Sequence, residues 1–189
     1  MTAPTLATPR LTLRPWRDAD VEPFAAMFAD PRVMEFLPAA PDHAGIEAIV
    51  GRIRAHFAEH GFGLWAAELK GSGDFIGFIG LSRVNFDAHF TPAVEVGWRL
   101  ASRFWDQGYA TEGAKAALDF GFARLGLAEI VSFTVLANRR SWRVMQRIGM
   151  THDPADDFDH PRLAAGDPWR RHVLHRMSRA RWEEISERH

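Results

Sequence analysis

The sequence predicts an α/β chain, more strictly an α+β chain, whose helices and strands share one core around a mixed sheet. Segments of alternating apolar and polar residues predict short strands, and apolar stripes with a helical period predict the helices between them. The expected order of elements is β-α-α-β-β-β-α-β-α-β, which includes a central β-α-β unit. The 189 residues fit one domain better than two, so we expect a single domain over 1–189.

The N-terminal segment predicts a strand and then a helix. Arg10–Arg14 alternates apolar and polar residues, and Pro15 is expected to end this strand. Asp18 is expected to cap a helix that runs to about Ala29, because an aspartate side chain accepts hydrogen bonds from the first backbone N–H groups. Asp30-Pro31 should stop this helix, since proline disfavours the helical conformation of the residue before it.

A second helix and two strands follow. Asp42 is expected to cap the helix and Gly61 to end it. One face of this helix is apolar and should be buried; it carries Ile46, Ile49, Val50, Ile53 and Phe57. Phe62–Leu69 and Phe75–Val84 are expected to be strands joined by a hairpin-like turn.

The second half of the chain predicts three strands, two helices and a short C-terminal helix. In order, we expect a strand at Ala93–Leu100, a helix at Gly108–Gly126, a strand at Ile130–Leu136 and a helix at Asn138–Ile148. Asp153–Asp167 is expected to be a loop, Arg171–Met177 the last strand, and Ser178 onward the short helix.

Composition excludes several classes of function. The chain has no cysteine, so disulfides, zinc–thiolate sites and thiol nucleophiles are excluded. The formal net charge of −1 argues against nucleic-acid binding by bulk charge. The first residues lack a signal-peptide pattern, and the apolar runs are too short to span a membrane. We therefore expect a cytoplasmic protein that binds neither nucleic acid nor membrane.

The segment Trp105–Glu112, with the sequence Trp-Asp-Gln-Gly-Tyr-Ala-Thr-Glu, predicts an anion site. It follows a predicted strand and opens a predicted helix near Gly108. The first turn of a helix presents unpaired backbone N–H groups and the positive end of the helix dipole. Gly108 and Ala110 are small enough for a pyrophosphate to approach the backbone closely.

This segment is similar to the acetyl-CoA-binding motif of GNAT acetyltransferases, written Gln/Arg-x-x-Gly-x-Gly/Ala. Trp105 departs from its first position, but the RimJ/RimL-like branch often has an aromatic residue there, followed by Gly-Tyr-Ala-Thr-Glu. Other blocks resemble the same branch in the same order: Leu11–Trp16, Asp30–Met34, Val94–Trp98, Asn138–Ser141 and Arg147–Met150. The resemblance covers nearly the whole chain, from about Arg10 to Met177.

The resemblance implies a GNAT fold, with a central, mostly antiparallel sheet flanked by helices. Its fourth and fifth strands, Val94–Leu100 and Ile130–Leu136, should splay apart so that pantetheine hydrogen-bonds to exposed backbone. Acetyl-CoA is then the co-substrate, and no metal is implied. The residues that the resemblance assigns to acetyl-CoA are Trp98, Leu100, Trp105, Gln107, Gly108, Tyr109, Ala110, Thr111, Asn138 and Ser141.

The implied activity is transfer of the acetyl group to a primary amine, either a peptide N-terminus or a small molecule, by direct attack in a ternary complex. Glu95 is the expected general base, acting through water. Many GNAT enzymes use a tyrosine as general acid, but the only tyrosine is Tyr109 and the usual position is occupied by Met145. Ser141 or water is therefore expected to take this role. A monomer or a homodimer fits equally well.

Several alternatives remain open. Glu95 is also compatible with a plain strand carboxylate, and Asn138 and Ser141 with the cap of a helix. The same fold also serves as a non-catalytic acyl-CoA-binding module. Two motif matches are rejected: Ala114 interrupts the nucleotide-binding P-loop pattern that starts at Gly108, and the His-x-x-x-His spacing that begins at His56 lacks a third zinc ligand.

Overall fold

The structure is a computed structural model and describes residues 4–37 and 39–187. The chain forms two compact units, and each is described by itself. The first unit contains the residues up to Ser82 and Gly97–Ala117. The second contains Arg83–Val96 and the residues from Leu118 onward. Two strands and one helix therefore contribute residues to both units.

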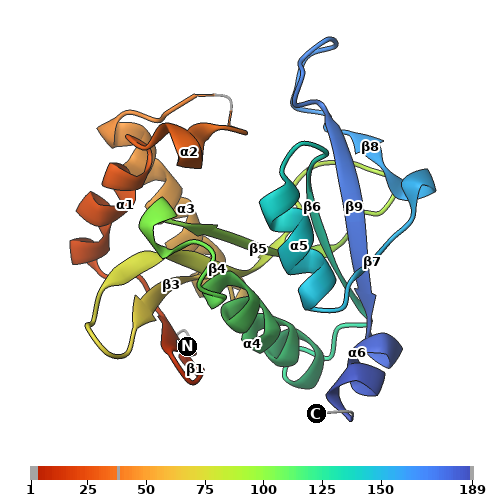
Figure 1. The fold of residues 1–189 in the computed structure, drawn as a ribbon, viewed down its shortest axis with the longest axis horizontal. Helices are drawn as coiled ribbons and strands as arrows, with labels where there is room; N and C mark the ends of the chain where they lie inside the picture. Colours follow the sequence, from red (N-terminus) through yellow and green to blue (C-terminus); the bar gives the residue numbers. More distant parts are fainter. Residues whose placement is uncertain (1–3, 38, 188–189) are drawn as a thin grey trace. The chain divides into compact units, whose positions relative to one another are not determined.

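The first unit packs two main helices against an antiparallel meander (Figure 1). Its strands pair in the order β1-β2-β3-β4, for example Leu13 with Ala67 and Ala66 with Phe78. Their side chains alternate, so Leu11, Leu13 and Trp65 are fully buried. The elements are β1 (Leu6–Ala7), β2 (Leu11–Arg14), η1 (Asp18–Asp20), α1 (Val21–Met27), α2 (Pro31–Met34), α3 (His43–His60), β3 (Leu64–Leu69), β4 (Phe75–Arg83) and η2 (Ser102–Phe104).

The second unit is built on β6 and β9, which pair antiparallel from Glu129 opposite Ser178 to Val135 opposite His172. Figure 1 shows α5 beside these strands and α6 following β9. Ser132 lies opposite His175 and Phe133 opposite Leu174, so successive pairs face opposite sides of the sheet. The elements are β6 (Glu129–Val135), α5 (Arg139–Arg147), β7 (Thr151–His152), η3 (Pro154–Asp156), β8 (Phe158–Asp159), β9 (Arg171–Ser178) and α6 (Arg179–Ser186).

Two elements are shared extensively between the units, β5 (Val94–Leu100) and α4 (Tyr109–Ala123), and β4 adds only its last residue, Arg83, to the second unit. Followed through β5, the hydrogen-bonded strand order is β1-β2-β3-β4-β5-β6-β9-β7, with β8 also on β9. The ladder between β5 and β6 is parallel and has a single registered pair, Glu95 with Val131. This mixed, mostly antiparallel sheet flanked by helices is the fold class that the sequence predicts.

The helix α3 has the boundaries that its sequence predicts. Asp42 Oδ1 accepts a hydrogen bond from the Gly45 N–H at 2.8 Å and caps its N-terminus. Gly61 ends it with φ +74°, in the left-handed region that glycine adopts without steric cost. The residues that α3 buries are Ile46, Val50, Ile53 and Phe57. Ile49 is only half-buried.

The prediction that Asp18 caps the first helix is wrong. Asp20 Oδ2 accepts from the Arg17 N–H at 2.7 Å, whereas Asp18 pairs with Arg54 on α3. Asp20 immediately precedes α1, makes no side-chain cap hydrogen bond to it, and is buried with its carboxylate bound twice by the guanidinium of Arg14. Asp30 ends the segment, as predicted, and also caps the additional short helix α2.

The expected loop over Asp153–Asp167 is partly regular, because it contains η3 and the two-residue strand β8. The strands β1 and β7, also two residues long, are further additions to the predicted elements. Such strands have no periodicity for a sequence to display, and each is held by a longer neighbour.

Two glycines let the backbone of β4 approach its neighbours. A Cβ atom on Gly77 would lie 2.1 Å from the carbonyl oxygen of Arg99, and one on Gly80 would lie 2.2 Å from that of Gly63. Both neighbours are main-chain atoms, which cannot move aside as a side chain can. In the described part of the chain, no helix has the length and apolarity needed to cross a membrane.

Candidate active site

The predicted phosphate loop lies at the N-terminus of α4. The helix begins at Tyr109, and its first intrahelical hydrogen bond runs from the Glu112 N–H to the Gly108 carbonyl at 3.0 Å. Asp106 and Gly108 have positive φ angles, 58° and 81°, and turn the chain into the helix. The N–H groups that precede Glu112 have no acceptor within the helix, so they are available to an anion.

Side chains of the loop bind the end of β5 and the short helix η2 that follows it. Trp105 is half-buried, and its Nε1–H donates to the Leu100 carbonyl at 2.8 Å. Gln107 is exposed and donates from Nε2 to the Arg103 carbonyl at 3.1 Å. Thr111 Oγ1 is buried and has no hydrogen-bond partner among the described residues. The structure thus gathers Leu100, Trp105 and Gln107–Thr111, and places the half-buried Trp98 two residues before Leu100 on β5.

This loop fits a diphosphate. Backbone donors and the positive end of a 15-residue helix converge on it. Gly108 presents no side chain, and the Thr111 hydroxyl is an additional buried polar group without a partner among the described residues. The first turn of α4 contains no lysine of the kind found in a P-loop. Lys115 lies farther along the helix and is exposed. These residues could hold the pyrophosphate of CoA.

Arg10, which sequence reasoning missed, lies against the same loop. Its Nη1 donates to the Gln107 carbonyl at 2.8 Å, and its Nε donates to Glu112 Oε2 at 2.6 Å. Its guanidinium also covers the ring of Tyr109, 4.5 Å from the centroid. The sequence gives no local signal for this contact, because Arg10 and Glu112 are 102 positions apart.

The other predicted residues, Glu95, Asn138 and Ser141, belong to the second unit. Glu95 is half-buried on β5, opposite Val131 of β6. Asn138 caps α5: its Oδ1 accepts from the Ser141 N–H at 3.2 Å, and its Nδ2 donates to Thr134 Oγ1 at 3.1 Å. The structure therefore brings Asn138 and Ser141 together, through the Ser141 backbone. Asn138 is a helix cap, as the alternative interpretation of this residue stated. The Ser141 hydroxyl takes no part in that cap, because Asn138 binds the Ser141 backbone N–H.

The position at which many GNAT enzymes have a tyrosine is part of the core. Met145 on α5 is 1% exposed. Beside it on the helix, Trp142 packs its ring against His175 of β9, with the centroids 5.3 Å apart. His175 in turn stacks on His152, whose Nε2 lies 2.8 Å from Asp157 Oδ1. Burial, reinforced by His152, lowers the pKa of His175 to about 4, so the ring is neutral at pH 7.

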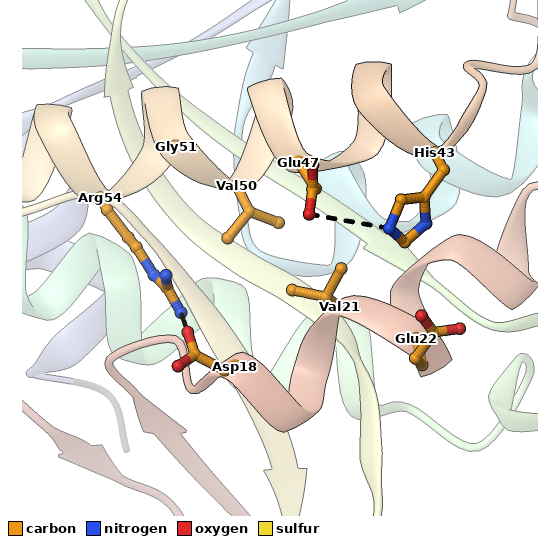
Figure 2. Close-up of a pocket in the computed structure, with 8 residues that line it drawn as sticks. All are labelled: Asp18, Val21, Glu22, His43, Glu47, Val50, Gly51 and Arg54. Carbon is orange, nitrogen blue, oxygen red and sulfur yellow. Dashed lines mark hydrogen bonds and ion pairs between the residues drawn. The ribbon is translucent and has the colours of Figure 1, made fainter.

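A shallow hollow of about 380 Å³ lies between α1 and α3, away from the predicted residues of this unit. Figure 2 shows the ion pair of Arg54 with Asp18 and the contact of His43 with Glu47. Its other lining residues are Val21, Glu22, Val50 and Gly51. Sequence reasoning did not predict this hollow, and none of the residues implied by the resemblance lines it.

Comparison with known proteins identifies the family of the chain. Residues 10–151 match a family model described as "Acetyltransferase (GNAT) domain". The chain is 32% identical over 199 residues to the FsC-acetyl coenzyme A-N(2)-transacetylase of Aspergillus fumigatus, with 95% of this chain and 83% of that protein covered.

Solved structures show the same fold. An acetyltransferase from Agrobacterium tumefaciens is 31% identical with a TM-score of 0.75, and 94% of this chain and 95% of that chain are covered. The RimJ protein of Mycobacterium smegmatis in complex with CoA-disulfide is 21% identical with a TM-score of 0.72, at 100% and 98% coverage, and shows the fold alone. From its family match and its relatives that are more than 30% identical, the chain belongs to the GNAT family and is an acetyl-CoA-dependent acetyltransferase.

Proposed function

We propose that the protein transfers the acetyl group of acetyl-CoA to a primary amine by direct attack in a ternary complex. The observation that carries this proposal is the loop Trp105–Thr111, in which Gly108 at φ +81° leads into the N-terminus of α4. The relative from Aspergillus fumigatus supports a nitrogen acceptor, because it is named for transfer to N(2). The acceptor is a small-molecule amine or a peptide N-terminus, and the sequence blocks favour the RimJ/RimL-like branch.

Three chemical demands assign the roles. The amine is protonated at neutral pH and has to lose a proton before its nitrogen attacks the carbonyl carbon. Glu95 takes this proton through a water molecule. Backbone N–H groups near Trp98–Leu100 stabilise the negative charge that develops on the carbonyl oxygen. As the carbon–sulfur bond breaks, the nitrogen loses its second proton, and the leaving thiolate takes up a proton that Ser141 or water relays.

The positions of the two side chains support these roles. Glu95 is half-buried on β5. Ser141 is partly buried in the first turn of α5, and Asn138 holds its backbone rather than its hydroxyl. The Ser141 hydroxyl is thus available as a donor. A thiolate is a good leaving group, so a weak donor suffices.

The first experiment is an acetyl-CoA consumption screen against small amines, polyamines and peptides with free N-termini, with mass spectrometry of the products. We expect one of these three classes of amine to gain an acetyl group on nitrogen. A protein that binds acetyl-CoA but acetylates none of these classes would instead support the non-catalytic acyl-CoA-binding alternative.

Glu95→Gln tests the assigned base. We expect turnover to fall by roughly 10²–10⁴-fold, the usual contribution of general-base catalysis, with little change in acetyl-CoA affinity. The loss should shrink at high pH, where more of the amine is already neutral. Glu129→Gln is the control, since it removes a strand carboxylate of the same unit that pairs with Arg176. Equal turnover of Glu95→Gln and wild type, with chemistry rate-limiting, would remove Glu95 from the mechanism.

A further inference from the structure

Arg10 joins the first strands to the phosphate loop through three groups. Its backbone N–H and its Nε both donate to the carboxylate of Glu112, at 2.8 and 2.6 Å. Its Nη1 donates to the Gln107 carbonyl at 2.8 Å, and its plane covers the ring of Tyr109. Thr8 Oγ1 adds a hydrogen bond of 2.6 Å to Glu112. All of these residues belong to the first unit.

The contact with Gln107 fixes the direction of a backbone donor. The carbonyl of Gln107 and the N–H of Gly108 belong to one planar trans peptide, so they point in opposite directions. By holding the carbonyl oxygen, Arg10 sets the direction in which the Gly108 N–H points. Arg10 Nη2 also lies 3.3 Å from where a Cβ atom of Gly108 would stand, so the guanidinium backs the loop directly.

The contact with Glu112 removes a charge that opposes anion binding. Glu112 lies in the first turn of α4, and its side chain is 15% exposed. Burial raises the pKa of Glu112, but hydrogen bonds from Thr8 and Arg10 lower it by more, so it is ionised at neutral pH. A bare carboxylate here would repel a phosphate. The guanidinium of Arg10 makes the pair neutral.

We propose that Arg10 is a positioning residue for the pyrophosphate of CoA. Through the Gln107 carbonyl it orients the Gly108 N–H, and through Glu112 it neutralises the negative charge of the first turn. This inference rests on the proposed function, in which the same loop binds the pyrophosphate. Arg10 acts on the bound diphosphate through the loop and does not take part in the chemical steps.

The test is calorimetric titration of Arg10→Ala with CoA and with 3′-dephospho-CoA, which keeps the pyrophosphate but lacks the 3′-phosphate. We expect both to bind about tenfold more weakly, a common size for the loss of a charged contact. The KM for acetyl-CoA should rise by the same factor, and kcat at saturation should stay within about twofold, because uniform binding is lost.

Arg54→Ala is the matched control. Arg54 also pairs with a carboxylate of the first unit at 2.7 Å, and its side chain is 43% exposed, against 48% for Arg10. It lies in the hollow of Figure 2, outside the phosphate loop. Both titrations and KM should be unchanged in this variant. A purely structural role of Arg10 would lower its melting temperature and leave the affinities of the folded protein unchanged.

Each outcome separates the hypotheses. A wild-type protein that does not bind CoA would overturn the proposed function itself. Wild-type affinity in Arg10→Ala would overturn only the inference about Arg10, as would a loss seen with CoA but not with 3′-dephospho-CoA. If Arg10→Ala does not fold, Arg10→Lys replaces it. A lysine keeps the charge beside Glu112 but lacks the planar fork, so CoA should still bind more weakly, and wild-type affinity would contradict the positioning role.

Discussion

At the scale of single residues, Gly108 combines a left-handed backbone conformation with the close approach of Arg10. Its φ of +81° lies in the region that residues with a Cβ atom adopt at a cost of roughly 1–2 kcal/mol. A Cβ atom would also stand 3.3 Å from Arg10 Nη2. Substitution there therefore acts on stability and on the loop at once, and a control has to separate the two effects.

We expect Gly108→Ala to weaken CoA binding and to lower the free energy of unfolding by about 1 kcal/mol. Gly73→Ala is the control, because Gly73 has φ +76°, lies far from the loop in sequence, and has no atom within 4 Å of where a Cβ atom would stand. It should lose similar stability and keep its CoA affinity. Titration calorimetry and urea unfolding measure both. Normal CoA binding by Gly108→Ala would place the phosphate site elsewhere.

Ser141 allows its hydroxyl to be tested without disturbing the helix cap, since Asn138 accepts from its backbone N–H. We expect Ser141→Ala to lower kcat about tenfold, which corresponds to about 1.4 kcal/mol of barrier. CoA affinity should change less, because the hydrogen bond strengthens only as charge develops on sulfur. A variant that melts lower but keeps its kcat would contradict the assignment.

At the scale of elements, α5 depends on its N-cap. Asn138 both accepts from the Ser141 N–H and donates to Thr134 on the strand before it. We expect Asn138→Ala to lower the free energy of unfolding by about 1 kcal/mol, the usual cost of a lost cap. Asn138→Asp keeps the acceptor and should lose less. Urea unfolding measures both, and equal stability of Asn138→Ala and wild type would show that the cap contributes nothing.

The elements also show what sequence can predict. The boundaries of α3 are predictable because Asp42 and Gly61 act locally, within one turn of the helix that they bound. The different roles of Asp18 and Asp20 at the start of the first helix are not predictable in this way. Asp20 is held by Arg14, which lies on another element. The loop at Gly108 that leads into α4 is predictable from its own residues, while its binding of phosphate stays a prediction. The contact of Arg10 with that loop is not, because it depends on how distant strands and helices come together.

The catalytic assignments illustrate the same limit. The family resemblance nominates Glu95 and Ser141, and the structure places Glu95 on a strand and Ser141 in the first turn of a helix. Their roles remain predictions, since a carboxylate on a strand or a serine in a first turn has the same sequence pattern whether or not it reacts. Only the kinetics of the substituted proteins distinguish these roles.

At the scale of the whole molecule, buried histidine makes stability depend on pH. His175 is 1% exposed, lies against His152 and Trp142 with Asp157 nearby, and its pKa is lowered to about 4. An unfolded histidine has a pKa near 6.5, so between these values the unfolded state binds more protons. The contribution of neutral His175 to the free energy of unfolding is therefore fully present above about pH 6.5. This contribution is lost as the pH falls toward 4.

We expect the free energy of unfolding to fall by about 2 kcal/mol between pH 7.5 and pH 5 on account of His175. His175→Phe keeps a flat ring and should flatten this dependence. His43→Gln is the control, because His43 is exposed and pairs only with Glu47 among the contacts that the structure shows for it. Urea unfolding at both pH values is the measurement. An unchanged slope in His175→Phe would assign the dependence to other groups.

The two glycines of β4 have a consequence for the history of this family. A Cβ atom added to Gly77 or Gly80 would lie little more than 2 Å from a main-chain oxygen. Almost no other residue can therefore be accommodated at either position while the strands keep their spacing. Descendants that change acceptor, or lose activity altogether, should therefore retain this pair longer than they retain Glu95 or Ser141. The two glycines, three positions apart, would then identify relatives of this chain even where the catalytic residues have changed.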